Sequence, residues 1–396
     1  MRPTFTLLLL LTFHLLIAQS GFKVVGYLPT YRFGALPQMQ LQRCTHVNIA
    51  FANPDMQGNL TTEGISITPA VNAAHLQGAK AFISLAGGYL TPAWKTAWDT
   101  LLQPANRAAF IQKIVQYALT HQLDGVDVDL EWQYVNSLYS PFVLELKPAL
   151  AAHNLQMTAA LPGSHRYPQI SNAALAAFDW INMMVYDLRG PWDPSNPGQH
   201  SPYDWAEQCI QYWKNQGVPA DKLTLGVPFY GYDFGVSPVK SFKFGDMVKL
   251  SPDYAYLDQV GDRYYNGIPT IQAKTQLALD EVSGIMIWEL GQDILDAGFE
   301  QYSLLKTIDE VIHPAVTVAE PDNAALNLFP NPATDWLQTP AAGQVQVFDL
   351  HGRVVLSETG SGESPLVLSL QNLPSGLYSV RCRVEGQWRS GRFVKL

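Results

Sequence analysis

Three acidic side chains alternate with apolar ones in one short segment of this chain. Residues 124–131 are Asp-Gly-Val-Asp-Val-Asp-Leu-Glu, so Asp127, Asp129 and Glu131 follow one another at intervals of two. In a β-strand such positions share one face, and like charges held so close raise one another's pKa, as burial does. Fold stability alone would not favour this arrangement. It suits chemistry in which one carboxyl group stays protonated near neutral pH beside an ionised partner. Asp124 has the opposite parity and is expected to be a structural capping group.

The composition describes a large folded protein with an acidic surface. The 396 residues are 47% hydrophobic and 15% charged, which allows one large domain and a small one and argues against global disorder. The net charge of −9 and the pI of about 5.4 disfavour nucleic acid and anionic membranes as partners. The chain has 10 Trp, 18 Tyr and 17 Phe. Most should pack in the core, and the remainder could serve as stacking platforms.

The N-terminus predicts a secretion signal over residues 1–20. Arg2 supplies the positive charge, Leu7–Ile17 the apolar stretch and Ala18-Gln19-Ser20 the small-residue exit. Cleavage is expected after Ser20, with cleavage after Ala18 as the alternative. The apolar stretch is too short for a comfortable membrane span, and we expect no span in the mature chain.

The cysteines and histidines predict neither disulfides nor a metal site. Cys44, Cys209 and Cys382 are odd in number and widely spaced, and the first two are expected to be buried free thiols. The nine histidines are scattered, without an H-E-x-x-H pattern, and no glycine-rich phosphate loop or nucleophile elbow occurs. We therefore expect no metal and no cofactor.

Eight short apolar runs alternate with helix-like stretches between residues 22 and 312. Most are rich in Val, Ile and Leu, as strands buried on both faces should be. The runs are Lys23–Tyr31, Thr45–Ala52, Ala81–Gly87, Gly125–Trp132, Met157–Pro162, Trp180–Asp187, Leu223–Tyr230 and Gly284–Leu290. Residues 107–120 and 140–152 have amphipathic helical spacing. This alternation predicts an α/β fold, a (β/α)8 TIM barrel over residues 21–312. Its functional residues should lie at the carboxyl ends of the strands.

The chain changes character after the predicted barrel. Residues 313–323 contain two prolines and no periodicity, so they are expected to form a linker. Residues 324–396 contain short alternating runs separated by turns, which predicts a small all-β, sandwich-like domain. That segment has no acid pair, no His/Cys cluster and no nucleophile motif. The chemistry should therefore belong to the barrel.

The acidic segment matches D-G-x-D-x-D-x-E, the signature of the family-18 glycoside hydrolases, the chitinase family. The resemblance extends over about residues 22–312. Further matches occur in order at Gly26-Tyr27, Ala159–Gly163, Met184-Val185-Tyr186-Asp187, Gly226–Gly231 and Gly284–Asp293. The resemblance implies retaining hydrolysis of β-1,4-linked N-acetylglucosamine polymers. In this family the substrate supplies its own nucleophile, the 2-acetamido carbonyl.

The resemblance also implies roles for individual residues. Glu131 would be the general acid and then the base for the attacking water. Asp129 would hold the acetamido N–H and stabilise the developing positive charge, and Asp127 would share a proton with Asp129. Tyr186 would donate its hydroxyl to the acetamido oxygen.

Further residues are expected to bind the substrate. Asp187 would contact the sugar at the cleavage site, and Trp288 would form the apolar floor under the distorted ring. The remaining substrate-binding candidates are Tyr27, Met184 and Tyr230. Glu289 is expected to be structural, because residues 124–131 already supply the acid.

Three features depart from the family pattern. The third strand ends Ser84-Leu85-Ala86-Gly87-Gly88, one residue longer than S-x-G-G, which predicts that Ser84 is displaced from the family's position. Tyr232 stands where many members have an arginine, which puts that arginine's contact to a neighbouring sugar in doubt. About 50 residues separate the seventh and eighth runs, too few for the α+β insertion of one branch of the family. We infer a shallow, open groove and endo-type attack.

The C-terminal domain resembles the type IX secretion sorting domain of Gram-negative bacteria. The resembling segments are Leu328–Ala333, Val347–Val354, Leu373–Tyr378 and Gly391–Leu396. The resemblance implies the type IX secretion machinery as a partner. It also implies a secreted or surface-attached location after export across both membranes. The alternative is a carbohydrate-binding β-module, for which Trp336, Tyr378 and Trp388 are the large aromatic candidates.

The leading hypothesis is a monomeric chitinase that binds chitin or other N-acetylglucosamine-containing oligosaccharides. One alternative keeps the chemistry but changes the substrate: an endo-β-N-acetylglucosaminidase acting on N-glycans or peptidoglycan-type glycans. A second alternative is a non-catalytic chitinase-like lectin. Inactive members typically lose the terminal glutamate, and here Glu131 is present.

Overall fold

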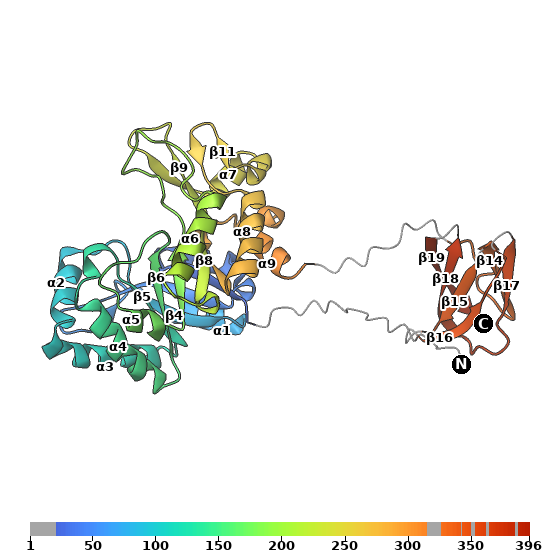
Figure 1. Cartoon of the computed structure of the whole chain (residues 1–396), viewed down its shortest axis with the longest axis horizontal. Helices are drawn as coiled ribbons and strands as arrows, with labels where there is room; N and C mark the ends of the chain where they lie inside the picture. The colour runs from blue at the N-terminus through green and yellow to red at the C-terminus, as the bar shows by residue number, and fades with distance from the viewer. Residues whose placement is uncertain (1–20, 315–325, 342, 350–352, 362–363, 385–386) are drawn as a thin grey trace, which may run out of the picture. The chain divides into compact units, whose positions relative to one another are not determined.

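The computed structural model describes residues 21–396 except 315–325, 342, 350–352, 362–363 and 385–386. The predicted signal peptide and most of the predicted linker fall outside these described residues. The chain divides into two compact units, one ending at Pro314 and the other beginning at Ala315 (Figure 1).

The first unit is built on a closed parallel barrel. Its strands are β1 (Lys23–Pro29), β2 (His46–Pro54), β4 (Lys80–Ala86), β5 (Gly125–Asp129), β6 (Gln156–Pro162), β7 (Trp180–Met184), β8 (Leu223–Pro228) and β13 (Gly284–Trp288). Each strand pairs in parallel with the next around the ring, and β1 closes it by pairing with both β13 and β2. The predicted (β/α)8 barrel is therefore confirmed, and the eight strands coincide with the eight apolar runs.

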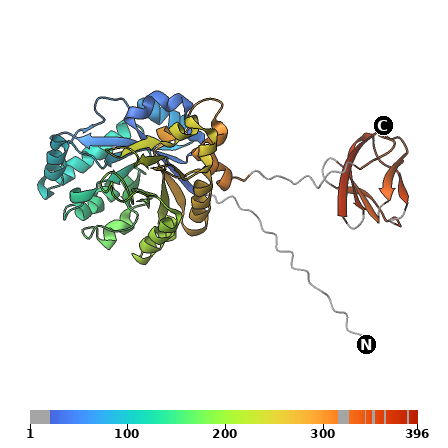
Figure 2. The ribbon, with the colours of Figure 1, turned by 90° about the horizontal axis from the view of Figure 1, so that it is seen from above.

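Helices lie on the outer side of the strands (Figure 2). The α-helices are α1 (Thr68–Leu76), α2 (Pro92–Leu101), α3 (Pro104–Thr120), α4 (Tyr139–Ala151), α5 (Asn172–Ala177), α6 (Tyr203–Asn215), α8 (Ile268–Glu281) and α9 (Leu304–Ile312). Helix α3 shows why they pack there. Phe110, Ile111, Ile114 and Val115 recur at helical spacing and are all buried. Each such side chain contributes roughly 1.5–3 kcal/mol through burial.

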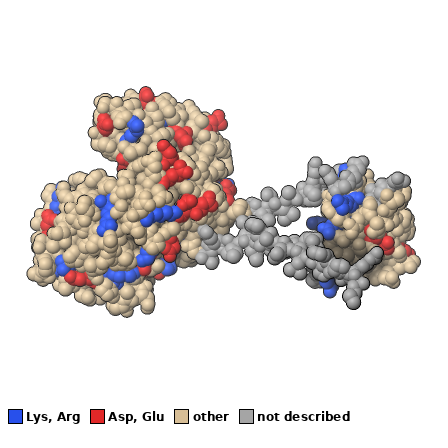
Figure 3. Space-filling model, viewed as in Figure 1, with Lys and Arg blue, Asp and Glu red and all other residues tan. Residues whose placement is uncertain are grey.

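A small lobe interrupts the barrel between β8 and α8. It contains an antiparallel sheet of β9 (Tyr230–Asp233), β10 (Lys240–Lys243), β11 (Gln259–Val260) and β12 (Arg263–Tyr264), with helix α7 (Phe244–Leu250). The lobe stands out from the barrel body (Figure 3). The prediction that this segment is too short for an α+β insertion is wrong. Strands of two to four residues make a compact insertion, so the loop length no longer supports an open groove.

Short 3-10 turns and one extra strand complete the first unit. The turns are Thr30–Gln38, Leu41–Arg43, Trp132–Tyr134, Ala220–Lys222, Pro252–Tyr256, Leu290–Gln292 and Glu300–Tyr302. Strand β3 (Leu60–Thr61) pairs antiparallel with β2. Cys44 and Cys209 are buried free thiols, as predicted. Asp124 has the structural role that was expected, because its Oδ2 accepts a hydrogen bond from the backbone N–H of Ala81 on the neighbouring strand β4.

The second unit is all β. Its strands are β14 (Trp336–Ala341), β15 (Gln344–Phe348), β16 (Val354–Glu358), β17 (Pro365–Ser369), β18 (Gly376–Val384) and β19 (Gln387–Lys395). They form a two-stranded sheet, β14-β17, and a four-stranded sheet, β16-β15-β18-β19. Burial alternates along β18, where Tyr378, Val380 and Cys382 face the core. The predicted all-β domain is confirmed. Across the described ranges of both units, no helix is long and apolar enough to cross a bilayer.

Candidate active site

A cavity of about 470 Å³ opens at the carboxyl ends of the barrel strands. Seven of the predicted site residues line it: Tyr27, Asp129, Glu131, Met184, Tyr186, Asp187 and Trp288. Asp127 lies one pleat deeper on β5 and is fully buried. Tyr230 reaches the site through its contact with Asp187. The barrel thus brings together residues that are more than 250 positions apart in the chain.

Asp127 is the acceptor at the centre of a buried polar cluster. Its Oδ2 accepts hydrogen bonds from Tyr27 at 2.8 Å and from Ser84 at 2.6 Å. Its Oδ1 accepts from Thr158 at 2.6 Å and from Asn182 at 3.3 Å. Burial raises the pKa of Asp127, and these four donors oppose the rise. Both oxygens are therefore supplied with donors from the barrel interior.

Asp129 is the opposite case, a buried carboxyl group short of partners. It is 3% exposed, and its Oδ1 has no hydrogen-bond partner within the described part of the chain. Burial, and then the neighbouring Glu131 and Asp127, raise the pKa of Asp129 well above its usual range. A buried acceptor left unsatisfied is unfavourable in a free protein. It becomes favourable when a ligand brings a donor.

Glu131 lies just beyond the end of β5, at the edge of the cavity. Burial, and then the nearby Asp187, raise the pKa of Glu131 to about 7. The next residue, Trp132, has a φ of 55°, a left-handed conformation that a bulky residue rarely adopts. Gly88 leaves room for this carboxyl group, because a Cβ there would lie 2.8 Å from Glu131 Oε1. The backbone on both sides therefore defines the position of this carboxyl group.

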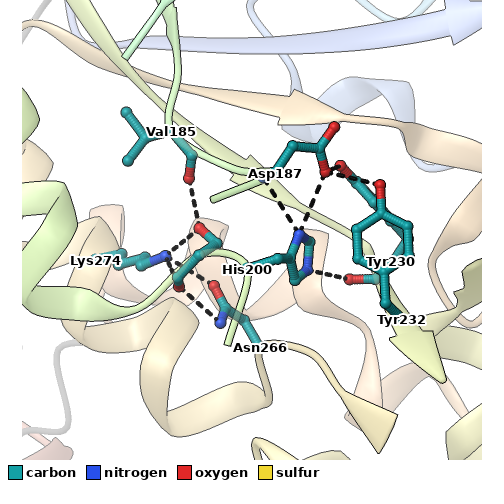
Figure 4. A network of polar contacts seen from close by, with 8 residues as sticks. Val185, Asp187, His200, Tyr230, Tyr232, Asn266 and Lys274 are labelled. Atoms are coloured by element: carbon teal, nitrogen blue, oxygen red, sulfur yellow. Dashed lines mark hydrogen bonds and ion pairs between the residues drawn. The ribbon is translucent and has the colours of Figure 1, made fainter. Parts of the chain in front are cut away.

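Tyr186 and Asp187 follow the end of β7. The Tyr186 hydroxyl lies 3.9 Å from Met286 Sδ, a weak acceptor, so it is available to a ligand. Asp187 has a φ of 66°. Its Oδ1 accepts hydrogen bonds from Tyr230 and, at 2.9 Å, from Tyr232 (Figure 4). Tyr232, where many family members have arginine, thus supports Asp187 from the lobe.

Aromatic rings form one wall of the cavity. Trp288 packs against Tyr27 with ring centroids 5.5 Å apart, and against Phe51 at 5.7 Å with nearly parallel rings. Tyr27 is only 1% exposed and donates to Asp127, so it supports the site from beneath. Trp288 lines the cavity, and its packing against these two rings holds it in place.

Sequence analysis missed several residues that matter here. Phe51 lines the cavity and Ser84 donates to Asp127. Ser84 lies on β4, and Ala86 at the end of that strand has a φ of 78°. For Ser84, the available sequence signal was the pattern S-x-x-G-G, which is one residue longer than S-x-G-G. His200 contacts Asp187, and nothing in its local sequence indicated this.

The described residues contain no group of three or more His, Cys, Asp or Glu arranged to hold a metal ion. Their chemistry is that of two carboxyl groups with raised pKa values, a free tyrosine hydroxyl and an aromatic wall. Such a set can donate a proton near neutral pH and can accept a hydrogen bond from the N–H of a bound amide.

Comparisons with known proteins match each of the two units to a family model. The family model for glycosyl hydrolases family 18 matches residues 23–293, and that for the secretion system C-terminal sorting domain matches residues 327–395. The crystal structure of the family-18 chitinase ChiB from the chitin utilization locus of Flavobacterium johnsoniae superposes with a TM-score of 0.71. It is 44% identical and covers 74% of this chain and 94% of its own.

Two curated relatives match over the barrel. A chitinase-like effector of Moniliophthora roreri is 30% identical over 248 residues, which span 54% of this chain and 59% of the effector. The class V chitinase of Arabidopsis thaliana is 26% identical over 268 residues, 59% of this chain and 68% of its own length. The site lies on the matched segment in this chain. The chain belongs to the glycosyl hydrolases of family 18 and carries a C-terminal secretion sorting domain.

Proposed function

We propose that this protein is a chitinase that hydrolyses β-1,4-linked N-acetylglucosamine polymers with retention of anomeric configuration. The observation that carries the proposal is the pair of carboxyl groups beyond β5. Burial raises the pKa of Glu131 to about 7, and Asp129 keeps a buried oxygen that has no partner among the described residues. The 44% identity to a chitinase from a chitin utilization locus supports chitin as the substrate.

Glu131 supplies the proton for bond cleavage. In its neutral form it donates to the glycosidic oxygen while the bond from that oxygen to the anomeric carbon breaks. The carbonyl oxygen of the sugar's own acetamido group attacks the anomeric carbon and forms an oxazolinium ion. Glu131, now ionised, takes a proton from a water that opens this ion. Two displacements at one carbon give net retention.

Asp129 and Tyr186 act on the acetamido group. The unpartnered Oδ1 of Asp129 accepts the acetamido N–H and offsets the developing positive charge. Asp127 lies beneath Asp129 on the same strand. Its two oxygens already accept hydrogen bonds from four donors, so it does not compete with Asp129 for the acetamido N–H. The Tyr186 hydroxyl donates to the acetamido oxygen and orients it towards the anomeric carbon.

The remaining site residues bind the sugar. Trp288 forms the floor under the ring, and Met184 adds apolar surface. Asp187 binds a sugar hydroxyl with the oxygen that the lobe leaves free. Tyr27 and Tyr230 act from behind, by fixing Asp127 and Asp187 respectively.

The sorting domain indicates export and a cell-surface or secreted location. We further propose that the type IX secretion machinery recognises this domain and that the delivered enzyme is a monomer. Endo-type attack is also part of the proposal. The lobe means that loop length no longer supports it, so the lengths of the products are the test.

Chitin hexamer tests the proposal directly. The wild-type chain should release shorter oligomers, and Glu131→Gln should release none while still binding the hexamer, because only the transferable proton is lost. The exposed Glu63, which lines the same cavity, provides the matched control, and Glu63→Gln should keep turnover. Undiminished turnover in Glu131→Gln would refute the mechanism. Binding without turnover by the wild type would favour a lectin. Cleavage of a high-mannose glycopeptide alone would favour the glycan alternative.

A further inference from the structure

Helix α8 carries a lysine that is completely buried. Lys274 is 0% exposed, and its ammonium donates to three oxygens: Ser201 O at 2.6 Å, Ser201 Oγ at 2.6 Å and Asn266 Oδ1 at 2.8 Å. All three acceptors are neutral. An ammonium has three N–H donors, so the hydrogen-bonding geometry is complete while the charge itself is not paired. Figure 4 shows Lys274 pointing towards Asn266, with both apart from Asp187.

Burying a charge among neutral partners is unfavourable for folding. Burial lowers the pKa of Lys274 to about 7, against the opposing effects of Asp258, Cys209 and Asp204. An apolar side chain of similar length would fill the same volume without this penalty. We therefore looked for a role of Lys274 in the segment to which it is hydrogen-bonded.

Lys274 binds the dipeptide His200-Ser201, which in turn is hydrogen-bonded to residues 185–188 just after β7. The Ser201 hydroxyl donates to the backbone carbonyl of Val185, and the backbone N–H of Leu188 donates to the carbonyl of His200 at 2.9 Å. Residues 185–188 are thus tied at both ends to the dipeptide His200-Ser201. Between the two ties lie Tyr186 and Asp187, the residues proposed to act on the substrate.

His200 extends this connection to the lobe. Its Nε2 lies 3.1 Å from the carbonyl oxygen of Tyr230, which can only accept, so this nitrogen carries the proton. Its Nδ1 lies 3.5 Å from the backbone N of Asp187. Asp187 has a left-handed φ, which surrounding contacts must maintain. One imidazole therefore connects the lobe with this backbone.

We propose that Lys274 is a positioning residue for the reaction, acting through Ser201 and His200 on Tyr186 and Asp187. This inference rests on the proposed chitinase function and extends it to a residue outside the cavity. The buried ammonium draws two oxygens of Ser201 towards α8. Residues 185–188, which follow β7, are then fixed in the position from which the Tyr186 hydroxyl can donate to the acetamido oxygen.

The test is a double-mutant cycle on the full chain with chitin hexamer. Lys274→Met should lower kcat by about 10- to 100-fold, because small misplacements of reacting groups have effects of that size. KM should change by no more than about twofold, because the aromatic floor is untouched. In a Tyr186→Phe background the same substitution should lower kcat by a clearly smaller factor, because one of the two groups that it positions is already gone.

Lys214→Met is the matched control. Lys214 lies on the neighbouring helix α6 and pairs with Glu281 on the surface, so kcat should stay at the wild-type value. Equal fold losses from Lys274→Met in both backgrounds would overturn the positioning role. If Lys274→Met fails to fold, Ser201→Ala replaces it in the same cycle, with the same criterion. Absence of wild-type turnover would refute the proposed function instead. The cycle would then be scored on hexamer affinity by calorimetry, where independent losses overturn the role of Lys274.

Discussion

Replacing Glu131 by glutamine should stabilise the protein at alkaline pH and leave it nearly unchanged at acid pH. The folded pKa of Glu131 is about 7, against an ordinary value of 4.5. Because the folded pKa is the higher one, the neutral carboxyl group contributes fully below about pH 4.5. That contribution is lost as the pH rises through 7. Above pH 8, the wild type therefore carries an unfavourable buried charge that Glu131→Gln lacks.

The magnitude follows from the size of the shift. A difference of about 2.5 pKa units corresponds to roughly 3.4 kcal/mol at 1.36 kcal/mol per unit. Glu131 is partly exposed at the cavity edge, so solvent screening should reduce this to about 1–2 kcal/mol. For a domain of this size, that is an increase in Tm of about 3–6 °C.

Scanning calorimetry at pH 4.5 and pH 8.5 measures this difference, following the transition of the larger unit. Glu131→Gln should melt above the wild type at pH 8.5 and within about 1 °C of it at pH 4.5. Glu63→Gln, on the exposed side of the same cavity, should show no such pH-dependent gain. A Tm gain of equal size at both pH values, or a loss at pH 8.5, would refute the electrostatic account of Glu131.

Other consequences concern turnover. Asp129→Asn should lower kcat on chitin hexamer by about 10²-fold or more, because charge stabilisation in the reaction is lost, and steady-state kinetics with near-wild-type rates would contradict it. Tyr186→Phe should lower kcat by at least about tenfold while changing Tm little, because within the described residues its hydroxyl contacts only the weak acceptor Met286 Sδ. A large Tm loss without a kcat effect would be the contrary result. The pH profile of kcat/KM should fall about tenfold per unit above pH 7, because Glu131 must be protonated to act. A rate that still rises at pH 8 would exclude it as the acid.

The barrel could be predicted from the sequence because its strands are long apolar runs. Strands buried on both faces need Val, Ile and Leu along their whole length, and this leaves a strong local signal. The boundaries were less accurate. The runs ending at Trp132 and Asp187 extend past the strand ends at Asp129 and Met184, and each of these two final residues has a left-handed φ.

The lobe could not be predicted in the same way. Its strands β9 to β12 are two to four residues long, too short for alternation to appear. Their stability comes from tertiary contacts, such as the hydroxyls of Tyr230 and Tyr232 on Asp187. Two tyrosines of this lobe contact Asp187, but only one of them was a predicted site residue. Tyr230 was a candidate through the family motif, whereas Tyr232 was noted only as a departure.

Some residues of the site could likewise be predicted from a local sequence pattern, and others could not. The carboxyl groups of Asp127, Asp129 and Glu131 were evident from their spacing, because a strand fixes which side chains share a face. His200 and Lys274 are single polar residues on a loop and a helix far along the chain. Their contacts with residues 185–201 exist only after the barrel closes, so no local pattern could indicate them.

The anomeric form of the first products tests the central claim most directly. The purified full chain is mixed with chitin hexamer, and the new reducing ends are followed by proton NMR before mutarotation. Substrate assistance by way of Asp129 and Glu131 predicts that the β-anomer appears first, in products of mixed length if attack is endo. Early α-anomer would show single displacement by water and would contradict the mechanism proposed here.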